Sequence, residues 1–147
     1  MKVFPLNKND VSALMLEHGI TPTLQRVEIA QILFAKPQHL SAEDVLTKVN
    51  NTAVQVSKAT VYNTLGLFAK EGLIREVIVD PTKVFYDPTT VPHHHFYNVD
   101  TGTLTDIDAE TVVLERIPEL PQGTTAAGVD VVIRVRTEQK AGDRQQK

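Results

Sequence analysis

The sequence predicts an α+β protein, with helices in its first half and a small α/β unit in its second half. Three observations predict this class. Apolar residues recur at helical spacing in four segments before residue 72. β-Branched residues and alternating patterns dominate from residue 73 onward. Residues 87–92 contain two prolines and no apolar period, so we expect a linker there, with domains at 1–86 and 93–136.

The first two helices are indicated by caps, breakers and apolar faces. We expect Asn9 or Asp10 to cap the first helix and Gly19 to end it. The second helix follows Pro22 and is expected to run until Pro37 stops it. Their apolar faces are formed by Val11, Leu14 and Met15 in the first helix and by Leu24, Val27, Ile29, Ile32 and Leu33 in the second.

The third and fourth helices have clearer start signals. Ser41 caps the third helix, and Asp44 stands at the third-residue position of a capping box. Ser57 caps the fourth helix, which ends at Gly72. The apolar faces are Val45, Leu46 and Val49 in the third helix, and Val61, Leu65, Phe68 and Ala69 in the fourth.

The segments that follow the helices have strand patterns. Residues 73–79 and 84–86 flank a turn at 80–83, and helices followed by one hairpin are typical of a winged helix-turn-helix. Beyond the linker, 95–99 and 103–107 flank a turn at 100–102, and alternation predicts a later strand at 129–135.

Two stretches of the second half have weaker patterns. Residues 108–116 could form a short helix, although three of them, Thr111-Val112-Val113, favour extension. Residues 137–147 are polar and have no apolar period, so we expect a disordered tail.

Composition narrows the classes of function. The 147 residues include no cysteine, which excludes disulfides, thiolate nucleophiles and cysteine zinc sites, so a metal ion must be held by nitrogen and oxygen ligands. Residues 1–6 are too short for a signal peptide, and no apolar run approaches a membrane span of roughly 20 residues. We therefore expect no membrane partner and a cytoplasmic location.

Charge is distributed unevenly along the chain. The net charge is −3, but residues 1–86 carry nine Lys or Arg against eight Asp or Glu, whereas residues 87–147 carry six against ten. A nearly neutral first half can bind nucleic acid if its basic residues gather on one face, and an acidic second half suits cation binding or assembly.

The start of the fourth helix has the residue types of a DNA-reading segment. In helix-turn-helix proteins the first turns of the second helix enter the major groove, where Lys and Ser meet phosphates and Tyr or Asn meets base edges. The alternative is a solvated helix start with one surface tyrosine. Four helices, a hairpin and a lysine at its turn together favour DNA binding. The candidate residues are Ser57, Lys58, Thr60, Tyr62, Asn63 and Lys83.

Three consecutive histidines indicate a metal site in the second half. On a strand, His93 and His95 share one face and His94 lies on the other. The turn at 100–102 sets Asp106 opposite either His95 or Phe96, depending on whether its loop has two or three residues. The alternative is a solvated strand edge or an incidental surface metal site.

Two residues of the first half could complete this site. Asp87 lies six residues before His93, and His39 precedes the third helix. Three imidazoles and two carboxylates suit a five- or six-coordinate Fe²⁺, Mn²⁺ or Zn²⁺. A cation bound from both sides of the linker would fix the angle between the domains, and in a dimer that angle sets the spacing of the two recognition helices.

These motifs together resemble those of the ferric uptake regulator family, across nearly the whole expected ordered length. The resemblance rests on residues 19–26 (GITPTLQR), 39–44 (HLSAED), 59–65 (ATVYNTL) and the histidine run. It implies a metal-dependent transcription factor that binds double-stranded DNA. The family's metal ligands fall on His39, Asp87, His93, His95 and Asp106, its recognition-helix tyrosine on Tyr62, and its second-helix arginine on Arg26.

The chain departs from most of this family in one respect. The first Cys-x-x-Cys pair of the family's structural zinc would align with Asn98 and Thr101, so we expect no cysteine-bound zinc and a dimerisation sheet held by packing alone. The cysteine-free chain, with its ending at 129–136, is most similar to the iron response regulator subgroup, whose members respond to haem as well as, or instead of, iron. Haem here would need an axial ligand among His93, His94 and His95.

Enzyme classes fit the sequence less well. The tripeptide at 100–102 matches that of aspartic proteases and begins like the phosphorylation loop of cation-pumping ATPases, but a plain hairpin turn explains it better. A metal-dependent hydrolase needs an open coordination position, which five protein ligands would not leave. We expect an iron- or haem-responsive repressor that acts as a homodimer on an AT-rich inverted repeat. The alternatives are a manganese- or peroxide-responsive regulator, and a metal- or haem-binding dimer without DNA binding.

Overall fold

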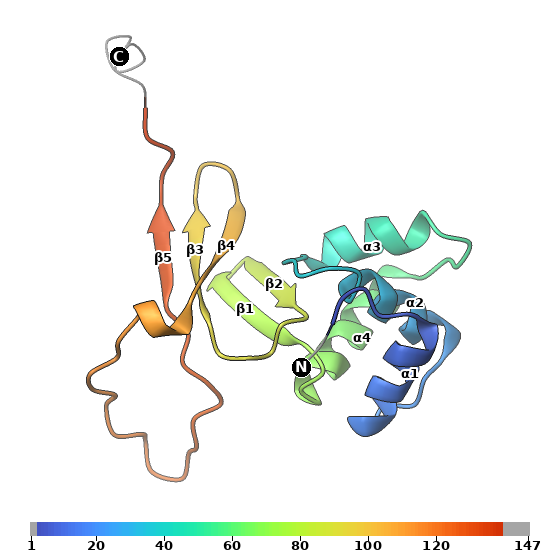
Figure 1. Ribbon diagram of the computed structural model, residues 1–147, viewed down its shortest axis with the longest axis horizontal. Coiled ribbons are helices and arrows are strands. Elements are labelled where there is room, and N and C mark those ends of the chain that lie inside the picture. The colour runs from blue at the N-terminus through green and yellow to red at the C-terminus, as the bar shows by residue number, and fades with distance from the viewer. Residues whose placement is uncertain (1–2, 140–147) are drawn as a thin grey trace. The chain divides into compact units, whose positions relative to one another are not determined.

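The α+β class is confirmed by the computed structural model of the chain, which describes residues 3–139 (Figure 1). The chain divides into two units between Val91 and Pro92. The first unit contains α1 (Lys8–Glu17), α2 (Leu24–Leu33), α3 (Ala42–Asn50), α4 (Lys58–Lys70), β1 (Arg75–Asp80) and β2 (Lys83–Asp87). The second contains β3 (His94–Asn98), β4 (Thr103–Ile107), the 3₁₀ turn η1 (Ala109–Thr111) and β5 (Val132–Val135). No helix in the described chain is long and apolar enough to cross a membrane.

The start of α1 differs from the prediction. Asn7 is the cap, because its side-chain oxygen accepts a hydrogen bond from the Asp10 amide at 2.8 Å, and the Asp10 carboxylate accepts one from the Asn7 amide at 3.0 Å. Asp10 therefore stands at the third position of a capping box and Asn9 lies inside the helix. The predicted end is confirmed, since Gly19 has a φ of +73°, which favours glycine.

The end of α2 also differs from the prediction. Thr23 caps the helix, but its last residue is Leu33, four residues before the expected stop at Pro37. Phe34 follows as the C-terminal cap and is fully buried. Leu24, which was assigned to the apolar face, is 65% exposed.

The helices α3 and α4 begin at the predicted caps, and their apolar faces are buried. Ser41 and Asp44 form the expected capping box of α3, and the Ser57 side chain caps α4. Burying each large apolar side chain contributes roughly 1.5–3 kcal/mol, so the inward face of α4 fixes which of its side chains point outward. The core of this unit includes Met15, Ile29, Leu33, Phe34, Val45, Val49, Val61, Leu65, Phe68 and Leu73.

The hairpin of the first unit is tied to the start of α3. β1 and β2 are antiparallel, and the last residue of β2, Asp87, pairs with Arg75, so Asp87 belongs to the strand and does not open the linker. An isolated antiparallel bridge joins Tyr86 to Leu40. The Leu40 amide donates to the Tyr86 carbonyl at 3.1 Å, and the Tyr86 amide donates to the Leu40 carbonyl at 2.7 Å. This bridge holds the residues on either side of it in register.

The second unit is a three-stranded sheet with β3 in the centre. β4 pairs with β3 in the antiparallel sense and β5 in the parallel sense. The predicted later strand, 129–135, is shorter, because only Val132–Val135 pairs. Of the suggested helix at 108–116 only η1 forms, and the described residues 112–131 contain no helix or strand. Pro118 and Pro121 remove backbone donors from this stretch and exclude helix.

The first residue of the predicted disordered tail is hydrogen-bonded to the turn of the second unit. Thr137 is anchored, since its amide donates to the Asp100 carboxylate at 3.0 Å and its hydroxyl oxygen accepts from the Asn98 side-chain amide at 3.2 Å. Residues 140–147 of the predicted tail lie outside the described residues.

Candidate metal centre and nucleic-acid interface

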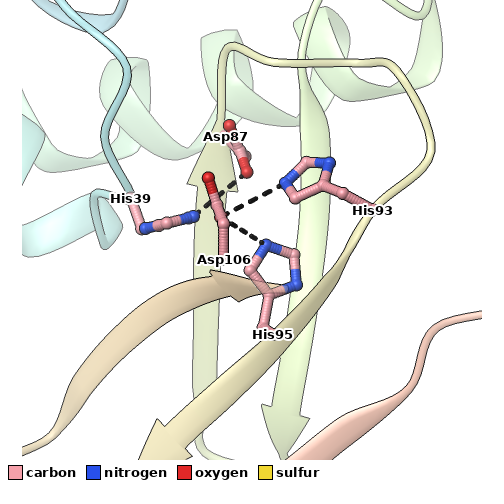
Figure 2. Close-up of side chains that lie close together, drawn as sticks. All are labelled: His39, Asp87, His93, His95 and Asp106. Carbon is pink, nitrogen blue, oxygen red and sulfur yellow. Dashed lines mark ion pairs between the residues drawn. The ribbon is translucent and has the colours of Figure 1, made fainter. Parts of the chain in front are cut away.

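In the first unit, the bridge between Leu40 and Tyr86 brings two candidate ligands together. His39 and Asp87 flank that bridge, and the His39 Nε2 atom lies 3.2 Å from the Asp87 Oδ2 atom (Figure 2). The other carboxylate oxygen of Asp87 accepts a hydrogen bond from the Thr89 amide at 2.8 Å, which orients the group. The first unit therefore presents one imidazole nitrogen and one carboxylate oxygen side by side.

In the second unit, strand pairing selects one of the two registers left open by the sequence. His95 lies opposite Asp106. The Nε2 atoms of His93 and His95 each lie 3.4 Å from the same oxygen, Oδ1 of Asp106, as the dashed lines in Figure 2 show. The two rings are 4.5 Å apart between centroids at an interplanar angle of 61°. Two nitrogen donors and one oxygen donor thus converge within this unit.

The chemistry of this donor set fits a cation. If both imidazoles carry their proton on Nδ1, their Nε2 lone pairs face a negatively charged oxygen, which is repulsive unless a proton or a cation lies between them. Nitrogen from histidine and oxygen from carboxylate are ligands of Fe²⁺, Mn²⁺ and Zn²⁺. His93, His95 and Asp106 could therefore hold such an ion, with His95 fully buried on β3 and His93 nearly buried directly before this strand.

The middle histidine has a different environment. The Nδ1 atom of His94 accepts a hydrogen bond from the Val131 amide at 3.1 Å, which ties β3 to the residue before β5. This nitrogen has no lone pair left for a ligand, and only Nε2 could bind one. Of the three haem candidates, His93 and His95 face Asp106, and His94 is held by the backbone of Val131.

The first turns of α4 divide into capping residues and outward residues. The Ser57 hydroxyl oxygen accepts from the Thr60 amide at 3.1 Å, and the hydroxyl donates to the Thr60 hydroxyl at 2.9 Å. These two side chains are engaged in starting the helix. Lys58, Tyr62 and Asn63 are exposed on the outer face. This outer face has donors and one aromatic ring, as the DNA-reading hypothesis requires.

One residue of this surface was missed by sequence reasoning. Glu43, in the first turn of α3, accepts a hydrogen bond from the Tyr62 hydroxyl and forms an ion pair with the Lys58 ammonium group, both at 3.2 Å and both on its Oε1 atom. An acidic residue in a first helical turn is usually explained by the helix dipole, so no separate signal for this contact is visible in the sequence.

The two remaining candidates lie on other elements. The Arg26 guanidinium donates from Nη1 to the Thr21 carbonyl at 2.8 Å and so braces the segment that leads into α2. Lys83 is exposed as the first residue of β2. Contact of either residue with DNA stays a prediction.

Asn98 and Thr101, which align with the first cysteine pair of the family's structural zinc site, lie in a hydrogen-bonded turn. The Asn98 side-chain oxygen accepts from the Asp100 amide at 2.9 Å and from the Thr101 amide at 3.2 Å. Gly102 has a φ of +71° and closes the turn, as expected for a plain hairpin. Together with the Thr137 contacts, these bonds correct the expectation that packing alone holds this sheet.

Comparison with known proteins gives matches that span both units. The sequence profile of the ferric uptake regulator family matches residues 17–132. The ferric uptake regulation protein of Pseudomonas aeruginosa is 37% identical over 95 residues, which cover 63% of this chain and 71% of that protein. The peroxide operon regulator of Bacillus subtilis is 30% identical over 90 residues, which cover 61% and 62%. The solved structure of the P. aeruginosa ferric uptake regulator with manganese aligns with a TM-score of 0.67 at 29% identity, covering 91% of this chain and 100% of that one.

Proposed function

This chain belongs to the ferric uptake regulator family, and from that premise we propose that it is an iron-responsive repressor that binds an AT-rich inverted repeat as a homodimer. Members of this family are metal-responsive transcription regulators and not enzymes. The finer parts of the proposal are the metal, the DNA contacts, the dimer and the cytoplasm as the place of action. Each part rests on particular residues.

The observation that carries the proposal is the position of the donor atoms along the chain. The hairpin of the helix-turn-helix unit ends in Asp87, which is paired with His39, and the donor set of the second unit begins at His93. The five residues between them, 88–92, let these two ends lie no more than about 20 Å apart. We propose that one cation takes ligands from both sets and thereby restrains the connection between the units.

The restraint would act on DNA through the dimer. A homodimer that reads an inverted repeat needs a fixed distance between its two recognition helices, because half-sites lie on one face of the duplex about 34–36 Å apart. We propose α4 as the recognition helix of a winged helix-turn-helix, with Lys58, Tyr62 and Asn63 toward the major groove. Ser57 and Thr60 would contribute by holding the start of the helix, and Lys83 would contact the backbone from the wing.

The nitrogen and oxygen donors suit Fe²⁺, Mn²⁺ and Zn²⁺ alike, and iron is proposed ahead of the other metals because of the similarity to a ferric uptake regulation protein. Manganese is the second candidate, since the aligned P. aeruginosa regulator was solved with manganese. A peroxide response is the alternative suggested by the B. subtilis relative. Zn²⁺ is expected to bind in vitro, because affinity follows the Irving–Williams order.

We propose a divalent ion and not haem as the effector. His93 and His95 are both directed at Asp106, and the Nδ1 atom of His94 is engaged by Val131. Haem binding through the Nε2 atom of His93 or His95 would have to break a contact with Asp106, and His94 could bind haem only through its Nε2 atom. The visible absorption spectrum of the purified protein titrated with haem tests this point, because an axial histidine would give a saturable Soret band that the His94→Ala variant loses.

The proposed function is tested by selecting DNA from a randomised duplex library and measuring its affinity for the full chain with EDTA, Mn²⁺ or anaerobic Fe²⁺. We expect metal to change the affinity for the selected DNA at least fivefold. This factor is the lower end of the range by which one bound ligand usually changes the affinity of a protein for a second ligand. The double substitution His93→Ala and His95→Ala should remove that change. A chain that selects no sequence, or whose affinity is the same with EDTA and with each metal, would show the proposal to be wrong.

A further inference from the structure

Glu43 joins two exposed groups of the proposed recognition surface. Its Oε1 atom lies 3.2 Å from both the Tyr62 hydroxyl and the Lys58 Nζ atom. The same Lys58 Nζ atom lies 5.8 Å from the centre of the Tyr62 ring, which is within cation–π range. The three side chains therefore form one connected group on the surface of the first unit.

The backbones that carry this group are fixed. The Asp44 carboxylate is bound to the Ser41 amide at 3.0 Å, so of the two acids in the first turn of α3 one serves the capping box and Glu43 reaches toward α4. Val45 in α3 and Val61 in α4 are fully buried in the core of the first unit. Only the side chains of the group can rearrange when a ligand approaches, because both helix starts are capped and packed.

We propose that Glu43 is a positioning residue that sets the specificity of the DNA-binding surface, an inference that rests on the proposed function. Its carboxylate holds the Tyr62 ring by a hydrogen bond in the orientation that meets a base. The same carboxylate holds the Lys58 ammonium group and carries a negative charge where DNA phosphates would approach. One residue thus restrains the phosphate contact and orients the base contact.

The two roles act on different parts of the binding energy. Phosphate contacts are independent of sequence and supply nearly all of non-specific affinity, so the charge of Glu43 lowers affinity for every duplex. Base contacts distinguish one sequence from another, so the hydrogen bond to Tyr62 affects only the ratio of specific to non-specific affinity. A substitution that separates charge from hydrogen bonding therefore separates the roles.

Glu43→Gln and Glu43→Ala provide this separation. Glutamine keeps an oxygen that accepts from Tyr62 but removes the charge. We expect Glu43→Gln to raise affinity for random-sequence and selected duplexes alike by about threefold to tenfold. The increase has two causes: Lys58 is released from its exposed ion pair, and the carboxylate no longer repels the DNA phosphates. Glu43→Ala should raise non-specific affinity equally but lower the specificity ratio by about threefold to tenfold, because the Tyr62 hydroxyl loses its acceptor.

The chain offers a matched control for charge. Glu71 is exposed and follows α4 at its opposite end. The 13 residues of α4 put about 20 Å between Lys58, at the start of the helix, and Glu71, beyond the screening length of about 8 Å at physiological salt. Glu71→Gln changes the net charge as Glu43→Gln does, and it should leave affinity for both duplexes within about twofold of the wild type.

The experiment is fluorescence anisotropy of the full, metal-loaded chain with both duplexes at several salt concentrations, with circular dichroism to show that each variant is folded. Release of Lys58 adds a phosphate contact, so the slope of log affinity against log salt should steepen by up to about one in Glu43→Gln. If Glu43→Gln behaves like Glu71→Gln, the charge role is wrong. If Glu43→Ala and Glu43→Gln have the same specificity ratio, the positioning role is wrong. Wild-type protein that binds neither duplex overturns the proposed function itself, and this inference with it.

Discussion

Asp106→Asn is the sharpest test of the donor set in the second unit. Asp106 supplies the one carboxylate of that set, and a single oxygen of it faces the Nε2 atoms of both His93 and His95 at 3.4 Å. Asparagine has nearly the same shape and keeps a neutral oxygen, but it lacks the negative charge that attracts a divalent ion. The Asp106 side chain is 52% exposed, so the substitution should change metal-free stability by no more than about 0.5 kcal/mol.

The size of the effect follows from binding linkage. Loss of a partner that only supports a metal ligand weakens metal affinity about 10- to 100-fold, so loss of a direct ligand should cost at least as much. At a metal concentration of about 100 times Kd, the wild-type protein gains about 2.7 kcal/mol of stability from the ion. A 100-fold weaker site gains only about 0.4 kcal/mol at the same concentration. The expected difference is therefore about 2 kcal/mol.

The assay is urea unfolding with Mn²⁺ and with EDTA, supported by calorimetric titration of Mn²⁺ into the folded protein. Asp108→Asn is the control, because Asp108 lies two residues further along the chain, is exposed and makes no capping hydrogen bond. It should show the full metal stabilisation of the wild type. Equal stabilisation by Mn²⁺ in the wild type and in Asp106→Asn would refute the assignment of Asp106 as a ligand.

Two further predictions concern the first unit. Ser57→Ala removes the cap of α4 and should lower the free energy of unfolding, measured in urea, by about 1 kcal/mol. The control is Ser12→Ala inside α1, which should not lower the free energy of unfolding. If the two variants lose the same stability within error, the capping role of Ser57 is wrong. Burial, and then the nearby charges of Glu76 and Tyr62, raise the pKa of Tyr86 above its usual 10.0, so folding favours the neutral phenol. That stabilisation is complete below pH 10.0 and is lost as pH rises through the folded pKa. Tyr86→Phe should accordingly show a shallower loss of stability between about pH 9 and 11, and identical slopes would count against a shifted Tyr86.

The helices and the hairpin could be predicted because their signals are local. Ser41, Asp44 and Ser57 are capping residues within three positions of the amides they bind, and the apolar spacing of α4 selects its buried face without reference to the rest of the chain. The alternation of His93, His94 and His95 is equally local. Such features depend on the geometry of a single helix or strand, and the spacing of residues in the sequence is enough to predict them.

The parts that could not be predicted depend on contacts between distant residues. Nothing near Leu40 indicates that its backbone pairs with Tyr86, and without that bridge the sequence offers His39 and Asp87 only as possible ligands of one site. The contact of Glu43 with Tyr62 joins residues 19 positions apart on two helices. The early end of α2 at Leu33 was likewise not indicated by the helical pattern, which continues toward Pro37.

One short segment of the first unit carries residues of both proposed sites. Within 39–44, His39 pairs with Asp87, Leu40 forms the bridge to the hairpin, and Glu43 holds the exposed groups of α4. Two backbone hydrogen bonds and a capping box leave this segment little freedom, so a displacement of His39 has to be taken up within four residues of Glu43. The metal set and the DNA surface therefore share a structural element inside the first unit. At a Mn²⁺ concentration that saturates each variant, a metal-dependent change in the Tyr62 environment that persists in Asp106→Asn but disappears in His39→Ala would identify this segment as the route.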